Sequence, residues 1–474
     1  MKHYPLEQLK QLHGFQIDAY LTALCGWQYG LQLTFHNRRP RDVFFGENTI
    51  PNEFPGVVFS LSDGTNTHTF YRTRGDKTSE KTIELCADKD AFKKYLIAHE
   101  IKTPIGETFK VHELDKMIAY ATDIGFPVIL KPVAGSMGRG VFINLKNIDE
   151  LKASIESMAA NFPEYEDIMI ETYFEGEDYR IYVVGDEVVA AYTRVPAYVT
   201  GDGKHNIEEL IKQKNKQRLE NPNTRNKLIK INENLKQFLK NQQLDMNDIP
   251  SENEVVYLSN IPNISRGGEP TDVTDELPQH IKDHIVQAVQ SIDGLPNVGV
   301  DVLINNETND FTIIEMNSVA VITSHVFPLH DEGIDIPEKI LKYYFPDITN
   351  KKRSHTHFDY VKTIEMLSTG MYDSLMIKPF NSDQETYKLT FKATVPWANV
   401  KTIQAMLQMH DFHGNIIYNE NSYQLTITAG NDMNIETLIE HLQKRFLFKD
   451  YTVDKSTERI LKSGIYIKDS NRAD

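Results

Sequence analysis

The chain has 474 residues, of which 40% are hydrophobic and 25% are charged. At roughly 150 residues per domain this length predicts several domains, and the composition excludes collagen-like, low-complexity and wholly disordered chains. Acidic residues outnumber basic residues by 67 to 51, and the formal net charge of −16 makes nucleic acid and anionic membrane surfaces poor partners.

The thiols and the N-terminus point to a reducing compartment. Cys25 and Cys86 are the only cysteines, too few for a disulfide framework or a thiolate metal site. Met1 to Leu12 lack the apolar run of a signal peptide, and no stretch approaches the about 20 apolar residues that span a bilayer. We therefore expect a cytoplasmic protein that makes no membrane contact.

Residues 1–83 are expected to form a small N-terminal α/β cap domain. A helical pattern at Leu6, Leu9 and Leu12 precedes a short apolar segment, Gly56 to Phe59, that is typical of a strand. Nothing in this part of the sequence indicates its role.

Residues 84–348 predict a second, α+β domain. A helix with an acidic N-cap is expected from Asp88, and the apolar run Val128 to Leu130 predicts a buried strand that ends at Lys131. Further strands are expected at Asp167–Thr172, Asp178–Val184 and Glu187–Arg194.

A polar stretch at about 204–252 is rich in Asn, Lys, Gln and Glu and predicts a helical insertion with a solvated surface. After it, Ile281 and Ile285 mark another helix. Two strands, Gly299–Ile304 and Phe311–Asn317, then form a predicted hairpin.

The polar residues 349–357 predict a linker to a third domain, residues 358–474. Its expected order is strand, helix, two strands, helix and strand, the βαββαβ pattern of ferredoxin-like domains. Together these predictions give an α+β fold class.

Three oxygen-bearing side chains converge on the predicted hairpin. Glu315 and Asn317 are two residues apart on one strand and share a face, while Asp301 is expected roughly opposite them. Two carboxylates this close repel each other unless a cation lies between them, and such ligands suit Mg²⁺ bound with phosphates. A hairpin with solvated acids is the simpler alternative, which the pattern alone favours.

A lysine and a glycine-rich segment elsewhere in the domain favour a phosphate and metal site over a hairpin with solvated acids. Lys131 ends an apolar strand and needs an anionic partner, and Gly135 to Gly140 follows it as a loop whose backbone N–H groups can approach phosphates. The lysine precedes the glycines, so this is not a Walker loop. Lys131 and Lys89 together predict two cationic side chains beside a nucleotide cleft.

The order of these signals resembles the ATP-grasp superfamily, in particular the subgroup of cyanophycin synthetase and the ligase half of bifunctional glutathione synthetases. The resemblance covers about residues 74–348, and the first eighty residues are too short for the additional half of the glutathione enzymes. The matching stretches are Arg74–Ser79, Asp88–Lys89, Val128–Pro132, Gly176–Arg180, Arg194–Gly203, Asn263–Gly268, Asp272–Asp275, Gly299–Asp301 and Glu315–Asn317.

The resemblance implies that Lys89 and Lys131 bind the phosphates of ATP. It also implies that a mobile loop covers them, with Ser136, Gly138 and Gly140 in contact with the nucleotide.

Other nucleotide and substrate contacts follow from the same resemblance. Glu171 and Tyr173 would belong to a hinge that reads adenine through its backbone, and Asp178 would accept from the ribose hydroxyls. Arg266 and His325 are weaker substrate candidates. Related sequences often carry a small hydroxyl residue in place of Arg266, a departure consistent with an altered acidic substrate or with no change.

The resemblance also assigns the metal and the reacting groups. Asp301, Glu315 and Asn317 would hold Mg²⁺, with Mn²⁺ as the alternative ion. Arg180 and Arg194 would face the reacting phosphate or acyl group, a task that suits a bidentate guanidinium. Surface salt bridges are the alternative for both arginines.

The implied activity is an ATP-dependent carboxylate–amine ligation through an acyl phosphate. The acid and amine would be an amino acid, a short peptide or a similar small metabolite, which the sequence does not identify. A nucleotide-binding sensor or assembly module without turnover and a phosphotransferase are the alternatives.

The C-terminal pattern resembles acylphosphatases more weakly. Lys401 stands where their arginine is expected, Asn419 matches their asparagine, and the segment Val395 to Val400 lacks their glycines. We therefore expect little hydrolysis and favour a packing or dimerisation module, which leaves a homo-oligomer open.

Overall fold

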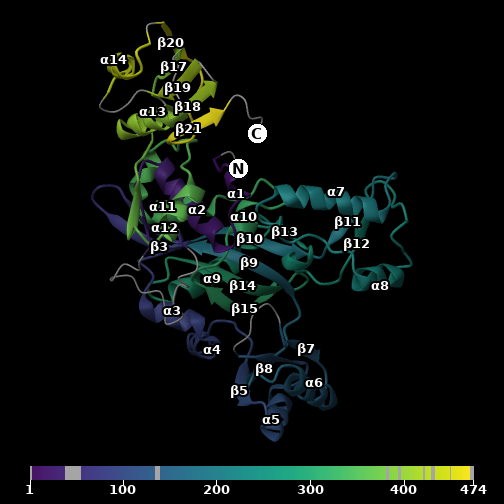
Figure 1. Ribbon diagram of the computed structural model, residues 1–474. Coiled ribbons are helices and arrows are strands. Elements are labelled where there is room, and N and C mark those ends of the chain that lie inside the picture. Colours follow the sequence, from purple (N-terminus) through teal and green to yellow (C-terminus); the bar gives the residue numbers. More distant parts are fainter. Residues whose placement is uncertain are drawn as a thin grey trace. The chain divides into compact units, whose positions relative to one another are not determined.

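The computed structural model describes residues 3–37, 55–133, 139–380, 384–392, 397–419, 422–428, 433–448 and 450–469 (Figure 1). Its helices and separate sheets confirm the α+β class. Contacts divide the described residues into two units, the first drawn from Met1–Pro40, Asn52–Arg72 and Tyr344–Asp474 and the second from Thr73–Tyr343. In the described ranges no helix is long and apolar enough to cross a membrane.

The N-terminal part of the first unit is a sheet packed on a buried helix. The helices α1 and α2 and the strands β1, β2 and β3 span Leu6–Leu9, Phe15–Gln28, Gln32–His36, Val58–Ser62 and Thr67–Tyr71. The strand β16 (Ser374–Ile377) pairs with the outer edge of β1, and α12 (Tyr360–Ser368) contacts it. The linker expected at 349–357 remains a prediction. After it in the chain, β16 is a strand of this first sheet and α12 packs on β16.

The C-terminal part of the first unit begins with the predicted βαββαβ order and adds one further strand. Its elements are β17 (Thr386–Lys392), α13 (Trp397–Met409), β18 (Gly414–Asn419), β19 (Ser422–Thr428), α14 (Ile435–Phe446), β20 (Tyr451–Ser456) and β21 (Ile465–Asp469). The sheet order is β20–β17–β19–β18–β21, and β21, which sequence reasoning missed, runs parallel to β18. Leu389, Leu407, Leu425 and Leu438 belong to its buried core. Val395 and Pro396 of the expected cradle lie outside the described residues, so the acylphosphatase resemblance stays a prediction.

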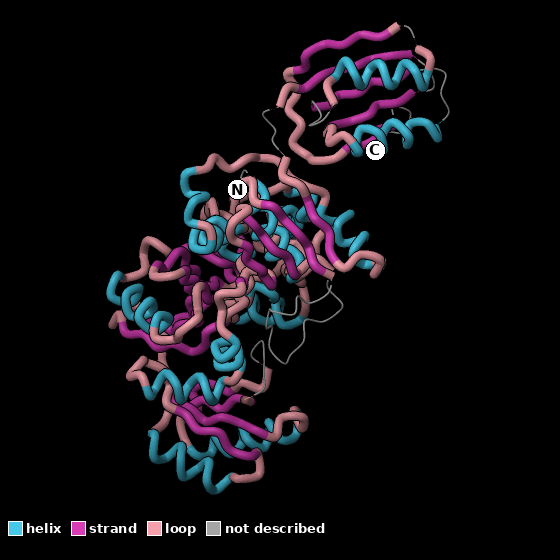
Figure 2. Tube along the Cα trace, turned by 90° about the vertical axis from the view of Figure 1, so that its left-hand side faces the viewer, coloured by secondary structure: helices cyan, strands magenta, loops and turns pink. Residues whose placement is uncertain are grey.

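The second unit contains a small sheet that includes β6, the strand on which Lys131 lies. Its order is β5–β8–β6–β7, and the helices α5 and α6 pack on it (Figure 2). Burial alternates along β6, so Val128 and Leu130 enter the core while Ile129 and Lys131 face the other way. The bounds are β5 Gly106–Lys110, α5 Leu114–Ile124, β6 Val128–Pro132, β7 Phe142–Leu145, α6 Ile148–Asn161 and β8 Asp167–Thr172.

The larger sheet of this unit is antiparallel and has the order β13–β10–β9–β14–β15. Ile281, Ile285 and Val289 of α9 pack into its core at the three- and four-residue spacing of a helical face. The bounds are β9 Glu177–Val184, β10 Glu187–Val195, β13 Glu269–Asp272, α9 Gln279–Gln290, β14 Asn297–Asn305 and β15 Asp310–Asn317. The predicted strands and hairpin are therefore confirmed.

The second unit contains further short elements. They are β4 (Arg74–Gly75), α3 (Glu80–Ala87), α4 (Lys89–Ala98), α10 (Thr323–Val326) and, continuing past its boundary, α11 (Ile336–Tyr344). The side chain of Asp88 accepts from the backbone N–H groups of Asp90 and Ala91, which makes it the N-cap of α4 as predicted.

The polar insertion has a small core of its own. Ile207, Leu210, Leu239 and Val256 are among its buried members. It is built from β11 (Tyr198–Thr200), α7 (Ile207–Glu220), α8 (Glu233–Asn241) and β12 (Val255–Tyr257), and the 3₁₀ turn η1 (Ile264–Arg266) follows it (Figure 1).

Candidate active site

A cavity of about 630 Å³ in the second unit brings the predicted lysines and acids together. Strands β6 and β8 supply one group of lining residues, the start of α4 another, and β9 with the β14–β15 hairpin the third. The lining includes Lys89, Lys131, Glu171, Asp178, Asp301, Glu315 and Asn317. Lys131 and Glu315 thus line the same cavity.

The hairpin acids are directly coupled. Asp301 pairs with Glu315 across β14 and β15, and Nδ2 of Asn317 donates to Oε1 of Glu315 over 3.1 Å. Burial raises the pKa of Asp301 to about 7, and the charge of Glu315 adds to this effect while Arg180 opposes it. Burial also disfavours ionised Glu315, but hydrogen bonds from Asp301 and Asn317 outweigh it and lower the pKa of Glu315.

These residues fit a hard divalent cation. An ionised Asp301 beside ionised Glu315 is costly in this buried place, and a cation bound by their oxygens would remove that cost. The side-chain oxygen of Asn317 offers a third, neutral ligand. No group of three or more His, Cys, Asp or Glu side chains suited to a metal occurs among the described residues, so such a site depends on this amide.

Each of the two predicted catalytic arginines is held by a carboxylate. Arg180 on β9 lies beside Asp301 on β14, with Nη2 to Oδ2 at 2.8 Å and Nε to Oδ1 at 2.5 Å. Arg194 on β10 donates from Nη1 to Oδ2 of Asp178 over 2.8 Å. The predicted ribose contact, Asp178, therefore shares its carboxylate with an arginine.

A buried cluster of two lysines and one glutamate lines the β6–β8 side of the cavity. Nζ of Lys131 lies 2.5 Å from Oε1 of Glu171, and Lys93 is paired with Oε2 of the same carboxylate. The two ammonium charges lower the pKa of Glu171 although its burial opposes this, and burial lowers the pKa of Lys93. Sequence reasoning missed Lys93. Its position four residues after Lys89 on one helix was the available signal.

Of the two residues named for the predicted adenine hinge, one lines the cavity and the other does not. The side chain of Glu171 lines the cavity and is only 2% exposed, but its strand lies between β5 and β6. The backbone N–H of Tyr173 donates to the carbonyl of Pro127 over 3.2 Å, and Tyr173 is not among the lining residues. The backbone role of this segment stays a prediction.

The glycine loop is only partly described. Ser136 and Gly138 lie outside the described residues. Gly140 is exposed with a φ of +73°, a conformation that favours glycine, and its neighbour Arg139 lines the cavity. Arg139 also pairs with Glu164 over 2.8 Å.

The two weaker substrate candidates lie away from the cavity lining. Arg266 lines a different cavity. His325 on α10 is 5% exposed, and its ring packs against those of Tyr182 and Tyr192 at centroid distances of 5.8 and 4.7 Å. Burial lowers the pKa of His325 to about 3, with a smaller effect from Arg180, so this imidazole is neutral at pH 7.

Comparisons with known proteins agree with this geometry. Residues 86–245 match the model of the RimK-like ATP-grasp domain. The chain is 31% identical over 300 residues to cyanophycin synthetase of Geminocystis herdmanii, covering 61% of this chain and 34% of that protein. It is also 31% identical over 286 residues to the glutathione biosynthesis bifunctional protein GshAB of Listeria monocytogenes, covering 59% of this chain and 37% of the relative.

A solved structure shows the same fold. The bifunctional glutathione synthetase from Pasteurella multocida aligns with a TM-score of 0.51 and 26% identity, over 61% of this chain and 40% of that one. The chain therefore spans little more than a third of the length of these relatives, and within it lies a RimK-like ATP-grasp domain with the ATP-grasp fold.

Proposed function

We propose that this protein is an ATP- and Mg²⁺-dependent carboxylate–amine ligase that forms an amide bond and releases ADP and phosphate. The observation that carries the proposal is the single cavity in which Lys131 and Lys89 face Asp301, Glu315 and Asn317. Cations for phosphate and oxygen ligands for a divalent ion are there side by side, within a domain similar to known ligases.

The reaction needs an activated acid, because a carboxylate is a poor acceptor for an amine. A carboxylate oxygen attacks the γ-phosphorus of ATP, the bond to the β-phosphate bridge oxygen breaks, and ADP leaves. The amine nitrogen then attacks the acyl carbon, its proton passes to solvent, and the carbon–oxygen bond to phosphate breaks. The protein chiefly positions these groups and neutralises their charge.

Lys89 and Lys131 bind the phosphates in this proposal, and Glu171 keeps the ammonium of Lys131 at the cavity wall. Arg194, which Asp178 of the cavity lining orients from β10, would act on the reacting phosphate or acyl group. Arg180, oriented by Asp301, stabilises charge on the transferring phosphoryl or acyl group.

Asp301, Glu315 and Asn317 would hold Mg²⁺, which neutralises phosphate charge when bound. Mn²⁺ accepts the same oxygen ligands, so the preference for Mg²⁺ is part of the proposal. The acid and the amine are amino acids, short peptides or similar small metabolites, bound without nucleic acid or membrane.

The test measures ADP release from the full chain with ATP and Mg²⁺, and searches for condensed products by mass spectrometry. We expect ADP only when pooled amino acids supply both an acid and an amine. Lys131→Ala should abolish turnover, whereas Lys116→Ala, at an exposed position on α5, should not. ATP binding without turnover over a broad acid and amine screen, or a phosphorylated product without an amide, would overturn the proposal.

A further inference from the structure

The polar insertion is a separate body attached to the larger sheet of the second unit. Its buried core, which includes Ile207, Leu239 and Val256, is distinct from the core formed by that sheet and α9. The chain enters the insertion after β10 and leaves it before β13, through two short crossings, residues 196–197 and 267–268. The insertion is therefore joined to the sheet at one edge only along the chain.

The two crossings begin at neighbouring points of the sheet. Val195 and Glu269, which border them, are partners in the register of β10 and β13. Gly267 has a φ of +97° and is followed by Gly268, so the second crossing can change direction at little conformational cost. This arrangement has the geometry of a hinge.

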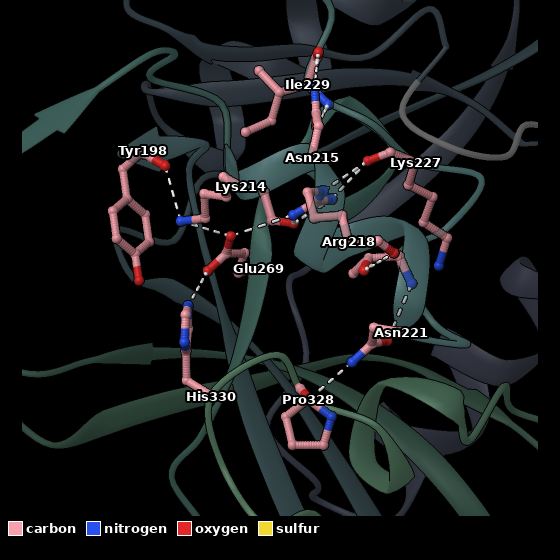
Figure 3. A network of polar contacts seen from close by, with 12 residues as sticks. Tyr198, Lys214, Asn215, Arg218, Asn221, Lys227, Ile229, Glu269, Pro328 and His330 are labelled. Carbon is pink, nitrogen blue, oxygen red and sulfur yellow. Dashed lines mark hydrogen bonds and ion pairs between the residues drawn. The ribbon is translucent and has the colours of Figure 1, made fainter. Parts of the chain in front are cut away.

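A buried carboxylate beside this hinge joins the insertion to the sheet (Figure 3). Glu269 is the first residue of β13 and is 2% exposed. Its Oε1 lies 2.8 Å from Nζ of Lys214 and 3.3 Å from Nη1 of Arg218, both on α7 of the insertion. The two cations are four residues apart, so they lie on the same face of the helix.

Both cations depend on this carboxylate. Arg218 has no exposed surface and Lys214 is 8% exposed, and in the described part of the chain Glu269 is the only acid with which either forms an ion pair. Burial lowers the pKa of Lys214 and of Arg218, and the charge of Glu269 opposes this. Without the carboxylate, two positive charges would remain in a buried place, which is costly unless water reaches them.

Other contacts on this side of the insertion are weaker. Nδ2 of Asn221, at the C-terminal end of α7, donates to the carbonyls of Phe327 and Pro328 over 3.2 and 3.1 Å. Nε2 of His330 lies 3.1 Å from Oε2 of Glu269, but the side chain of His330 is 55% exposed, so this pair adds little (Figure 3). Water can replace such contacts at small net cost, whereas it cannot replace the buried carboxylate in the same way.

The insertion has internal contacts that do not involve Glu269. Nδ2 of Asn215 on α7 donates to the carbonyl of Ile229, and its Oδ1 accepts from the N–H of the same residue, both over 2.9 Å (Figure 3). Asn206 and Glu209 form a capping box at the start of α7. With its own apolar core, the insertion can stay folded when its contact with the sheet is broken.

We propose that Glu269 is a latch: its charge holds the insertion on the larger sheet, and without that charge the insertion separates at its two crossings as a folded body. Lys214 and Arg218 become exposed to solvent on separation, while α7 stays helical. This goes beyond the proposed function, because the movement needs neither ATP nor turnover.

The test compares the side chains and the backbone of α7 in the full chain without nucleotide. Acetylation by a water-soluble ester, followed by mass spectrometry, measures how accessible the amine of Lys214 is. Lys216, which is exposed on the same helix, is the internal reference. Amide hydrogen exchange measures whether α7 remains helical. In the wild type we expect slow labelling of Lys214 and fast labelling of Lys216.

Glu269→Gln keeps the size of the side chain but removes its charge. We expect labelling of Lys214 relative to Lys216 to rise at least about tenfold, while amide exchange of α7 stays within about twofold of wild type. Glu252→Gln, at an exposed acid of the insertion, should label like the wild type. His330→Gln should have a smaller effect than Glu269→Gln, because this side of the carboxylate is exposed.

Two outcomes in Glu269→Gln would overturn the proposal. Unchanged labelling of Lys214 would mean that the cations stay buried without the carboxylate. A joint rise in labelling and in amide exchange of α7 would mean that the insertion unfolds and does not separate as a body. The wild type provides a second measurement that does not depend on the variant folding: low concentrations of urea should raise labelling of Lys214 before α7 loses its protection. A simultaneous rise of both at global unfolding would also overturn the proposal.

Discussion

The ammonium of Lys89 lies 3.9 Å from Oε2 of Glu315, which joins the first turn of α4 to the end of β15 at the cavity. The pair is partly exposed, so its Coulomb attraction adds little stability. The pair matters for the site, because it places the proposed metal ligand Glu315 beside Lys89, which is proposed to bind phosphate.

Glu315→Gln should remove metal-dependent turnover while leaving the fold intact. The substitution keeps the size of the side chain but removes a charged oxygen ligand, so we expect ADP release to fall at least about a hundredfold. Glu307→Gln changes an exposed acid in the turn of the same hairpin and should retain activity. A Mg²⁺ titration of ADP release on both variants checks this, and activity in Glu315→Gln close to wild type would contradict the metal assignment.

Arg180→Lys should lower kcat far more than it changes stability. Lysine keeps the positive charge near Asp301 but cannot reproduce contacts from two guanidinium nitrogens, so we expect about a hundredfold loss in kcat. Steady-state ADP release measures kcat, and a thermal melt checks the fold. The control is Arg445→Lys, an exposed position in the last turn of α14 outside the cavity lining, which should tolerate the change. A kcat similar to wild type in Arg180→Lys would leave this arginine with only a structural role.

Removal of the Glu171 carboxylate should destabilise the second unit. Glu171→Gln leaves Lys93 buried beside Lys131 without a compensating charge, which costs about 3–5 kcal/mol in comparable buried pairs. Urea unfolding followed by fluorescence measures the loss. Glu113→Gln removes an exposed ion pair with Lys116 and should show no loss.

The second change Lys93→Met should recover part of the stability lost in Glu171→Gln, because it removes the uncompensated charge. An equal loss in the single and double variants would show that the carboxylate acts by packing and not by charge.

Residues close in sequence or on one hairpin were predictable, and residues brought together by the fold were less so. The alternation of β6 and the short β14–β15 turn put Lys131 on one face and Asp301 opposite Glu315, because strand periodicity and hairpin register are local properties. The pairing of β16 with β1 is set by a sheet edge that no local pattern encodes. Lys93 was missed for a similar reason, since its partner Glu171 lies on a different element.

The latch at Glu269 was even less visible in the sequence. It depends on Lys214 and Arg218, whose burial gives no local signal because a charged residue in a polar helix is expected to be exposed. Arg266 was recognised from the resemblance alone, and its place away from the nucleotide cavity required the fold.

His325 should make stability fall as the solution is acidified. Its pKa is about 3 in the folded protein against 6.5 for the free side chain, so the unfolded chain binds the additional proton between these values. Stability therefore rises with pH across this window, by about 1.4 kcal/mol per pH unit where the unfolded imidazole is charged and the folded one is neutral. Urea unfolding at pH 7 and pH 5 measures the change, and His325→Gln should lose this contribution while the half-buried His357, whose pKa burial lowers to about 4, keeps its own. An identical pH dependence in wild type and His325→Gln would mean that His325 is protonated in the folded protein, and the neutral, ring-packed imidazole described above would be wrong.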